Sequence, residues 1–166
     1  MTIEIGTRIP DATLYESTTF GEACPLSPEK VSVAEATKGK KVVIFGLPGA
    51  YTPTCSAKHL PGYVEQLDAL KGKGVSEVWC VSVNDGFVMA AWGKALGAFG
   101  KVRMLGDGSA EFAKKIGLDK DLTAAGMGMR MQRFSMLVDD GVVKRVNVEA
   151  PGKFEVSDAR TMLGQL

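Results

Sequence analysis

Residues Lys40–Tyr63 read KKVVIFGLPGAYTPTCSAKHLPGY, and this stretch decides the fold class. Its first part, Lys40–Leu47, is an apolar and largely β-branched run that predicts a buried strand. The prolines and glycines that come next predict a tight turn. A helical pattern over Cys55–Leu70 follows, so strand, turn and helix come in direct succession. A single cysteine, Cys55, stands where the turn meets the helix.

The remaining segments also alternate between short apolar strands and helical patterns. Asp140-Gly141, between two apolar alternations in Arg133–Glu149, is a strong hairpin signal. Ser157 is the predicted N-cap of a terminal helix. Further strands are expected over Glu77–Asn84 and Val102–Leu105, and further helices over Asp85–Leu96 and Ala110–Leu118, the last with Gly117 near its end.

This order of elements predicts an α/β domain in which helices flank a central mixed sheet. The most economical match is a thioredoxin-like fold with an N-terminal extension. No linker-like segment interrupts the pattern, so we expect residues 1–166 to form one domain.

The composition argues against several classes of function. The 166 residues carry a formal net charge of +1, and no Lys/Arg cluster is flanked by stacking aromatics, so a nucleic-acid partner is not expected. No apolar run approaches the roughly 20 residues that span a bilayer, and no secretory signal is visible. Three widely spaced cysteines indicate free thiols in a reducing compartment. We expect a cytoplasmic protein, or an organellar one from which a transit peptide was removed.

The position of Cys55 favours a reactive, accessible thiolate. A helix N-terminus offers unpaired N–H donors and the positive end of the helix dipole, and such settings lower the pKa of cysteines from about 8.5 to roughly 3.5–7.5. Pro48 and Gly49 let the chain turn off the strand without bulky side chains that would block access. The alternative is that Cys55 is a small apolar residue packed at a helix start.

Pro48, Thr52 and Cys55 have the spacing P-x-x-x-T-x-x-C, which resembles the active-site signature of the peroxiredoxins. The stretch GLPGAYTPTCSAKHLPGY resembles their type II, or peroxiredoxin-V-like, subgroup. Similarity continues through VSVNDGFVMAAWGKALG, DGSAEF and RFSMLVDDGVVKRVNVE, so it covers essentially the whole chain. The resemblance implies a thiol-dependent peroxidase for hydrogen peroxide and organic hydroperoxides. Cys55 would attack the terminal oxygen and become a sulfenic acid.

This chemistry calls for a cation that stabilises the thiolate and polarises the O–O bond, and a guanidinium suits both tasks. The family pattern ends in Arg-Phe at the strand start, which matches Arg133, while Arg130 is the second candidate and otherwise a surface or supporting charge. By resemblance, Thr52 donates to and accepts from the peroxide oxygens, and Pro48 shields the thiolate from water. No metal, haem or flavin is expected, because the redox chemistry stays on sulfur.

His59 is the only histidine and lies four residues after Cys55, on the same helical face. A Cys–His protease pair lacks any further support in the sequence. A metal site would have only these two ligands, because Cys24 and Cys80 are too weakly placed to complete it. We expect His59 to support the pocket, and a packed histidine in the core is the alternative.

The sulfenic acid needs a second thiol for reduction. Cys80, in the middle of a predicted strand, is either a buried small hydrophobe or the resolving cysteine, because plant-like type II members carry a cysteine at this place. The loop cysteine of mammalian-like members is absent, with Val156 where it would fall. Glutathione, glutaredoxin or thioredoxin would otherwise serve as reductant. Cys24, in an N-terminal loop, has no counterpart and is taken as incidental.

Leu47, Phe87 and Leu118 are candidates for apolar walls that admit organic hydroperoxides. The resemblance also implies a homodimer formed through the face with the active-site loops. Two rival functions are a thiol–disulfide oxidoreductase, which would need a C-x-x-C pair that Ser56-Ala57-Lys58 does not supply, and a binding or chaperone-like protein.

Overall fold

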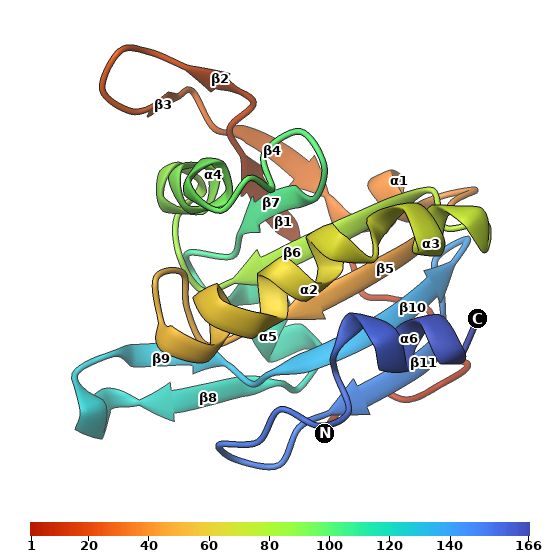
Figure 1. Cartoon of the computed structure of the whole chain (residues 1–166). Coiled ribbons are helices and arrows are strands. Elements are labelled where there is room, and N and C mark those ends of the chain that lie inside the picture. The colour runs from red at the N-terminus through yellow and green to blue at the C-terminus, as the bar shows by residue number, and fades with distance from the viewer.

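A seven-stranded mixed sheet forms the centre of the protein, which is described here by a computed structural model of residues 1–166 (Figure 1). The strand order is β11-β10-β5-β6-β7-β1-β4. The β5–β6 and β6–β7 pairs are parallel and the other neighbours are antiparallel. The strands are β1 (Thr13–Glu16), β4 (Glu29–Ser32), β5 (Lys41–Gly46), β6 (Glu77–Ser82), β7 (Arg103–Gly106), β10 (Phe134–Asp139) and β11 (Val142–Val148). This confirms the predicted thioredoxin-like α/β fold.

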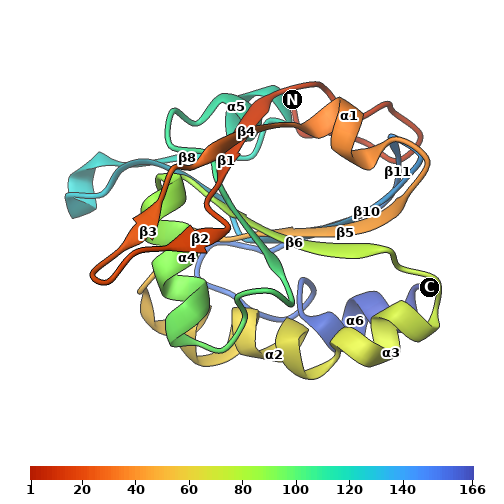
Figure 2. The same cartoon turned by 90° about the horizontal axis from the view of Figure 1, so that it is seen from above.

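Helices cover both faces of the sheet (Figure 2). Successive strand residues point to opposite faces, so Val42 and Ile44 enter one apolar cluster while Val43 and Phe45 enter the other. On the Phe45 side lie α2 (Leu60–Glu65), α3 (Leu67–Gly72), α4 (Gly86–Ala95) and α6 (Ala159–Gly164), and on the other side lie α1 (Val33–Thr37) and α5 (Glu111–Lys115). None of the helices combines the length and the apolar character needed to cross a membrane.

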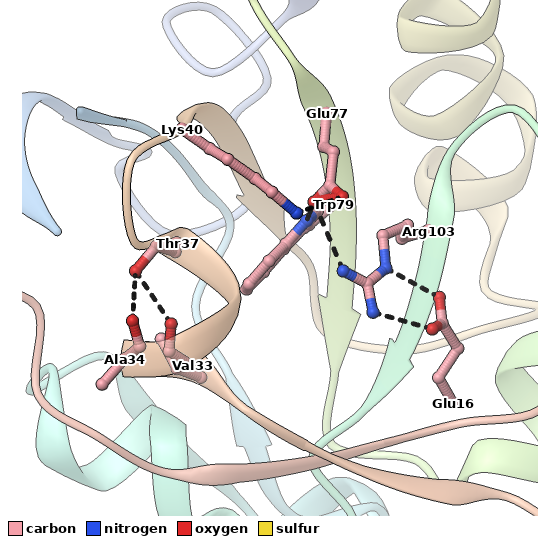
Figure 3. Close-up of polar contacts among 8 residues, drawn as sticks. All are labelled: Glu16, Val33, Ala34, Thr37, Lys40, Glu77, Trp79 and Arg103. Carbon is pink, nitrogen blue, oxygen red and sulfur yellow. Dashed lines mark hydrogen bonds and ion pairs between the residues drawn. The ribbon is translucent and has the colours of Figure 1, made fainter. Parts of the chain in front are cut away.

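The predicted N-terminal extension is part of the main sheet, because β1 pairs with both β7 and β4. A small hairpin, β2 (Thr19–Phe20) with β3 (Pro25–Leu26), lies in the segment between β1 and β4. Arg103 on β7 fastens the extension by pairing with Glu16 on β1 at 2.8 Å and with Glu77 on β6 at 3.3 Å (Figure 3). Burial alone would raise the pKa of Glu77, but hydrogen bonds and charge from Trp79, Arg103 and Lys40 lower it overall.

The predicted hairpin turns at Asp140-Gly141, where both residues have positive φ, 47° and 77°, as a type I′ turn requires. One prediction for the end of the chain is wrong. The N-cap of α6 is Asp158, whose side chain accepts from the N–H of Thr161, and not Ser157. Ser157 is fully buried, and its hydroxyl donates to Glu149 instead.

The hairpin between β8 (Asp119–Leu122) and β9 (Gly128–Met131) was not predicted. Its strands are joined through a short 3₁₀ turn over Thr123–Ala125. The sequence DKDL lacks the apolar alternation that marks a strand, so the pairing depends on the turn and on backbone hydrogen bonds. This hairpin places Arg130 on β9 and leads directly to Arg133.

Candidate active site

Cys55 lies in the first turn of a helix that begins at Pro53, and from Cys55 onward the helix is wider than an α-helix. Residues Cys55–His59 form a π-helical turn in which the N–H of Leu60 donates to the carbonyl of Cys55. Pro61 explains the widening, because it has no N–H to donate to the carbonyl four residues earlier and its ring would clash there. The helix continues as α2, is interrupted at Gln66 and resumes as α3.

The loop before Cys55 is anchored to the end of β6 and the turn after it. The hydroxyl of Ser82 donates to the carbonyl of Leu47 at 3.1 Å. The Asn84 side-chain oxygen accepts from the N–H of Ala50 at 3.0 Å. These bonds fix the turn at the carboxyl edge of the parallel strands, which is the edge where α/β proteins place their sites.

Arg133 connects the helix start to the segment before β10. One guanidinium nitrogen lies 3.2 Å from the Sγ of Cys55, and the other terminal nitrogen lies 2.9 Å from the Nδ1 of His59. The guanidinium also lies 5.7 Å from the ring centre of Phe154, within the range of a cation–π contact. Because a guanidinium is always protonated, Arg133 places a permanent positive charge beside the sulfur.

Arg130 has different partners. Its Nε donates to the carbonyl of Met127 at 2.9 Å, and a terminal nitrogen donates to the carbonyl of Pro48 at 3.4 Å. Arg130 therefore supports the turn, and of the two arginines it is Arg133 that contacts Cys55.

His59 is fully buried and neutral. Burial, followed by the charge of Arg133, lowers its pKa from 6.5 to about 3. Its Nε2 lies 3.1 Å from the carbonyl of Ser157, which can only accept, so Nε2 carries the proton. The Nδ1 is then free to accept from Arg133. His59 thus orients the guanidinium and does not exchange protons near neutral pH.

Glu149 organises the loop that holds this histidine, and it was missed in the sequence. Its carboxylate accepts from the backbone N–H groups of Glu155, Val156 and Ser157 and from the Ser157 hydroxyl, at 2.7–2.9 Å. Burial would raise the pKa of Glu149, but these hydrogen bonds outweigh it and lower the pKa. The carboxylate meets these N–H groups only when the loop between Glu149 and Ser157 folds back on itself. No sequence motif therefore marks Glu149.

Two expectations about access are wrong. Cys55 has no exposed surface, whereas the sequence suggested an accessible thiol. Of the three candidate apolar walls, Leu47 and Leu118 are buried in the core. Phe87 is exposed and lines a separate hollow with Tyr15 and Pro28. The cavity beside the Cys55–Arg133 contact has a volume of about 560 Å³, and none of these three residues lines it.

The other sequence-predicted residues are placed as follows. Pro48 lines this cavity, and the hydroxyl of Thr52 donates to the carbonyl of Gly49 at 2.7 Å. Cys80 is fully buried on β6, and burial, with a smaller contribution from Cys55, raises the pKa of its thiol. Cys24 is exposed, and all three cysteines are free. No three His, Cys, Asp or Glu side chains converge as metal ligands would.

The buried neutral state of His59 predicts a specific pH dependence of stability. Because its pKa is lowered from 6.5 to about 3, the unfolded chain binds a proton below about pH 6.5 that the folded chain does not. Stability should therefore fall as the pH drops, by at most about 1.4 kcal/mol per pH unit from this group. His59→Asn, which keeps an acceptor near Nδ1, should lose this part of the slope. Urea denaturation between about pH 7.5 and about pH 5 measures the free energy of unfolding of both proteins. If this free energy depended on pH equally in the wild type and in His59→Asn, His59 would not be the group responsible.

Comparison with known proteins identifies the family of the chain. The Redoxin family model matches residues 4–163. Peroxiredoxin-2B of Arabidopsis thaliana is 46% identical over 164 residues, covering 99% of this chain and 98% of that protein. Related plant peroxiredoxins have names that mark them as chloroplastic or mitochondrial.

Two solved structures cover at least 99% of both chains. One, from Burkholderia cenocepacia and provisionally assigned as a thioredoxin reductase, has a TM-score of 0.95 and 56% identity. The other, reduced Prx3 of Vibrio vulnificus in complex with hydrogen peroxide, has a TM-score of 0.91 and 49% identity. The chain therefore belongs to the redoxin family and is a type II peroxiredoxin, a thiol peroxidase.

Proposed function

We propose that the thiolate of Cys55 reduces hydroperoxides by attacking their terminal oxygen. A sulfur–oxygen bond forms and the O–O bond breaks, so the peroxide is reduced and sulfur is oxidised to sulfenic acid. The departing oxygen takes up a proton and leaves as water or an alcohol. The observation that carries this proposal is the 3.2 Å contact between the Arg133 guanidinium and the Sγ of Cys55.

Arg133 would act at two stages of the reaction. Before attack, its charge stabilises the thiolate, and during attack its N–H groups face the developing negative charge on the departing oxygen. Its second hydrogen bond, to the neutral His59, keeps the guanidinium in place without a competing positive charge. His59 is in this account a positioning residue and neither a base nor a nucleophile.

Thr52 and Pro48 complete the proposed peroxide site. Because the Thr52 hydroxyl proton is donated to the Gly49 carbonyl, its oxygen can only accept, and it would receive the O–H of the incoming peroxide. Pro48 lines the cavity beside Arg133 and offers no N–H of its own, so it limits the access of water. The buried position of Cys55 favours slim substrates: hydrogen peroxide and the unhindered ends of organic hydroperoxides.

We infer that an external thiol resolves the sulfenic acid. The external thiol forms a mixed disulfide with Cys55 and releases water, and a second thiol then restores Cys55 and leaves as a disulfide. Glutathione with glutaredoxin, or thioredoxin, has this chemistry. Cys80 is the less favoured resolver, because it lies in the middle of β6 and burial raises the pKa of its thiol, which disfavours the nucleophilic thiolate.

We further propose a homodimer in the cytoplasm or an organelle. Three free cysteines fit a reducing compartment. The exposed rings of Tyr15 and Phe87, which line one hollow, are apolar surface of the kind that interfaces cover. A thiol–disulfide exchange function has less support, because the nearest thiol in sequence, Cys80, is buried.

Replacing the buried Cys55 and, separately, the exposed Cys24 tests the proposed function. Cys55→Ser should abolish hydrogen peroxide consumption in the presence of a thiol reductant, because Cys55 is the cysteine whose sulfur is hydrogen-bonded to Arg133. The matched control, Cys24→Ser, removes an exposed thiol and should retain the wild-type rate. A circular dichroism spectrum shows that each variant is folded. Peroxide turnover that survives in Cys55→Ser would overturn the proposal.

Mass spectrometry separates the two routes of resolution. After one equivalent of peroxide, we expect a Cys55 sulfenic acid that added glutathione converts to a mixed disulfide, and Cys80→Ser should give the same product. An intramolecular Cys55–Cys80 disulfide in the wild type, lost in Cys80→Ser, would show instead that Cys80 resolves the intermediate.

A further inference from the structure

Lysines from three separate segments line the cavity beside the Cys55–Arg133 contact. Lys58 comes from the π-helical turn, Lys120 from β8, and Lys153 from the loop after β11. These segments are far apart in the sequence and meet only in the folded chain. The reaction described above assigns no task to any of the three ammonium groups.

The three lysines have no acidic partners within ion-pair distance. The ion pairs of the protein involve other cations: Lys38, Lys40, Arg103 and Lys115. Two acidic residues line the same cavity. Glu149 is occupied by the hydrogen bonds of its own loop, and Glu155 is exposed to solvent. The charge available to a ligand in this cavity is therefore predominantly positive, with Arg133 adding a fourth cation.

We propose that this cavity binds the carboxylate of the small molecule that reacts at Cys55. The role of this ligand as a reactant at Cys55 rests on the proposed peroxidase function. The binding of a carboxylate in the cavity can be tested without peroxide. An unpaired ammonium group gains a charge-assisted hydrogen bond from a carboxylate. A ligand held in this way would present its reactive end toward sulfur. Two kinds of reactant share this chemistry: a hydroperoxide that carries a carboxylate, and a thiol reductant that carries one.

Alkylation of Cys55 tests the site independently of peroxide chemistry. Iodoacetate and iodoacetamide react by the same displacement, in which the thiolate forms a carbon–sulfur bond and iodide leaves, and they differ in having a carboxylate or an amide. We expect the iodoacetate-to-iodoacetamide rate ratio to be higher at Cys55 than at the exposed Cys24 of the same molecule. Peptide mass spectrometry measures both sites in one sample.

Substitution of the lysines should lower this ratio. In a combined Lys58→Gln, Lys120→Gln and Lys153→Gln variant, the ratio at Cys55 should fall at least about threefold, since each exposed pair contributes modestly. The wild-type ratio should fall in the same direction at high salt. The matched control exchanges three exposed lysines outside the cavity for glutamine, at Lys30, Lys71 and Lys144, and should keep the wild-type ratio. An equal ratio in the cavity variant and the control would overturn the proposal.

Two further rate ratios identify the reactant. Cumene hydroperoxide and its para-carboxy derivative probe the oxidation of Cys55, and glutathione and its diethyl ester probe the reduction of the sulfenic acid. A lysine-dependent preference for the charged partner in the first pair assigns the site to the hydroperoxide, and in the second pair to the reductant. No preference in either pair would refute the proposed role in turnover. If the wild type consumed no peroxide at all, the proposed function would fail, while the alkylation ratio would still decide the carboxylate site.

Discussion

The structure of the site depends on one guanidinium that is shared between a sulfur and an imidazole. Arg133 contacts the Sγ of Cys55 and the Nδ1 of His59 at the same time, and a planar group with several donors can do this without moving. The arrangement requires a neutral histidine, which burial provides. It also requires a fixed Ser157 carbonyl, which the Glu149 loop provides. The site is thus held together by contacts between residues far apart in the sequence, such as His59 and Ser157, which are 98 positions apart.

Cys55 is buried, yet a charged group of the protein, the Arg133 guanidinium, lies 3.2 Å from its sulfur. A thiolate in an apolar interior would be disfavoured, as the raised pKa of the buried Cys80 illustrates on the neighbouring strand. Both cysteines belong to the same apolar cluster, but only Cys55 has the guanidinium within hydrogen-bonding distance. The contrast gives a physical reason why one cysteine of this cluster suits peroxide chemistry and the other suits packing.

Local patterns in the sequence predicted most of the fold. The β5 strand, the hairpin at Asp140-Gly141 and the terminal helix follow from side-chain period and turn chemistry, both of which act between near neighbours. The N-cap was misplaced by one residue because Ser157 and Asp158 are both good caps, and the choice depends on the hydrogen bond that the Ser157 hydroxyl donates to Glu149, eight residues earlier. Three features depend on how separate segments meet in the folded chain, and no local sequence pattern predicts them: the burial of Cys55, the Glu149 loop and the lysine-lined cavity.

We propose that Arg133, and not Arg130, activates Cys55. The most direct measurement is the second-order rate constant for oxidation of Cys55 by hydrogen peroxide, determined by stopped flow for Arg133→Gln and Arg130→Gln beside the wild type. We expect a loss of at least about a hundredfold for Arg133→Gln, comparable with removal of a donor to developing negative charge in other enzymes. We expect a much smaller change for Arg130→Gln. A wild-type rate in Arg133→Gln, or the larger loss in Arg130→Gln, would show that Arg133 does not activate Cys55.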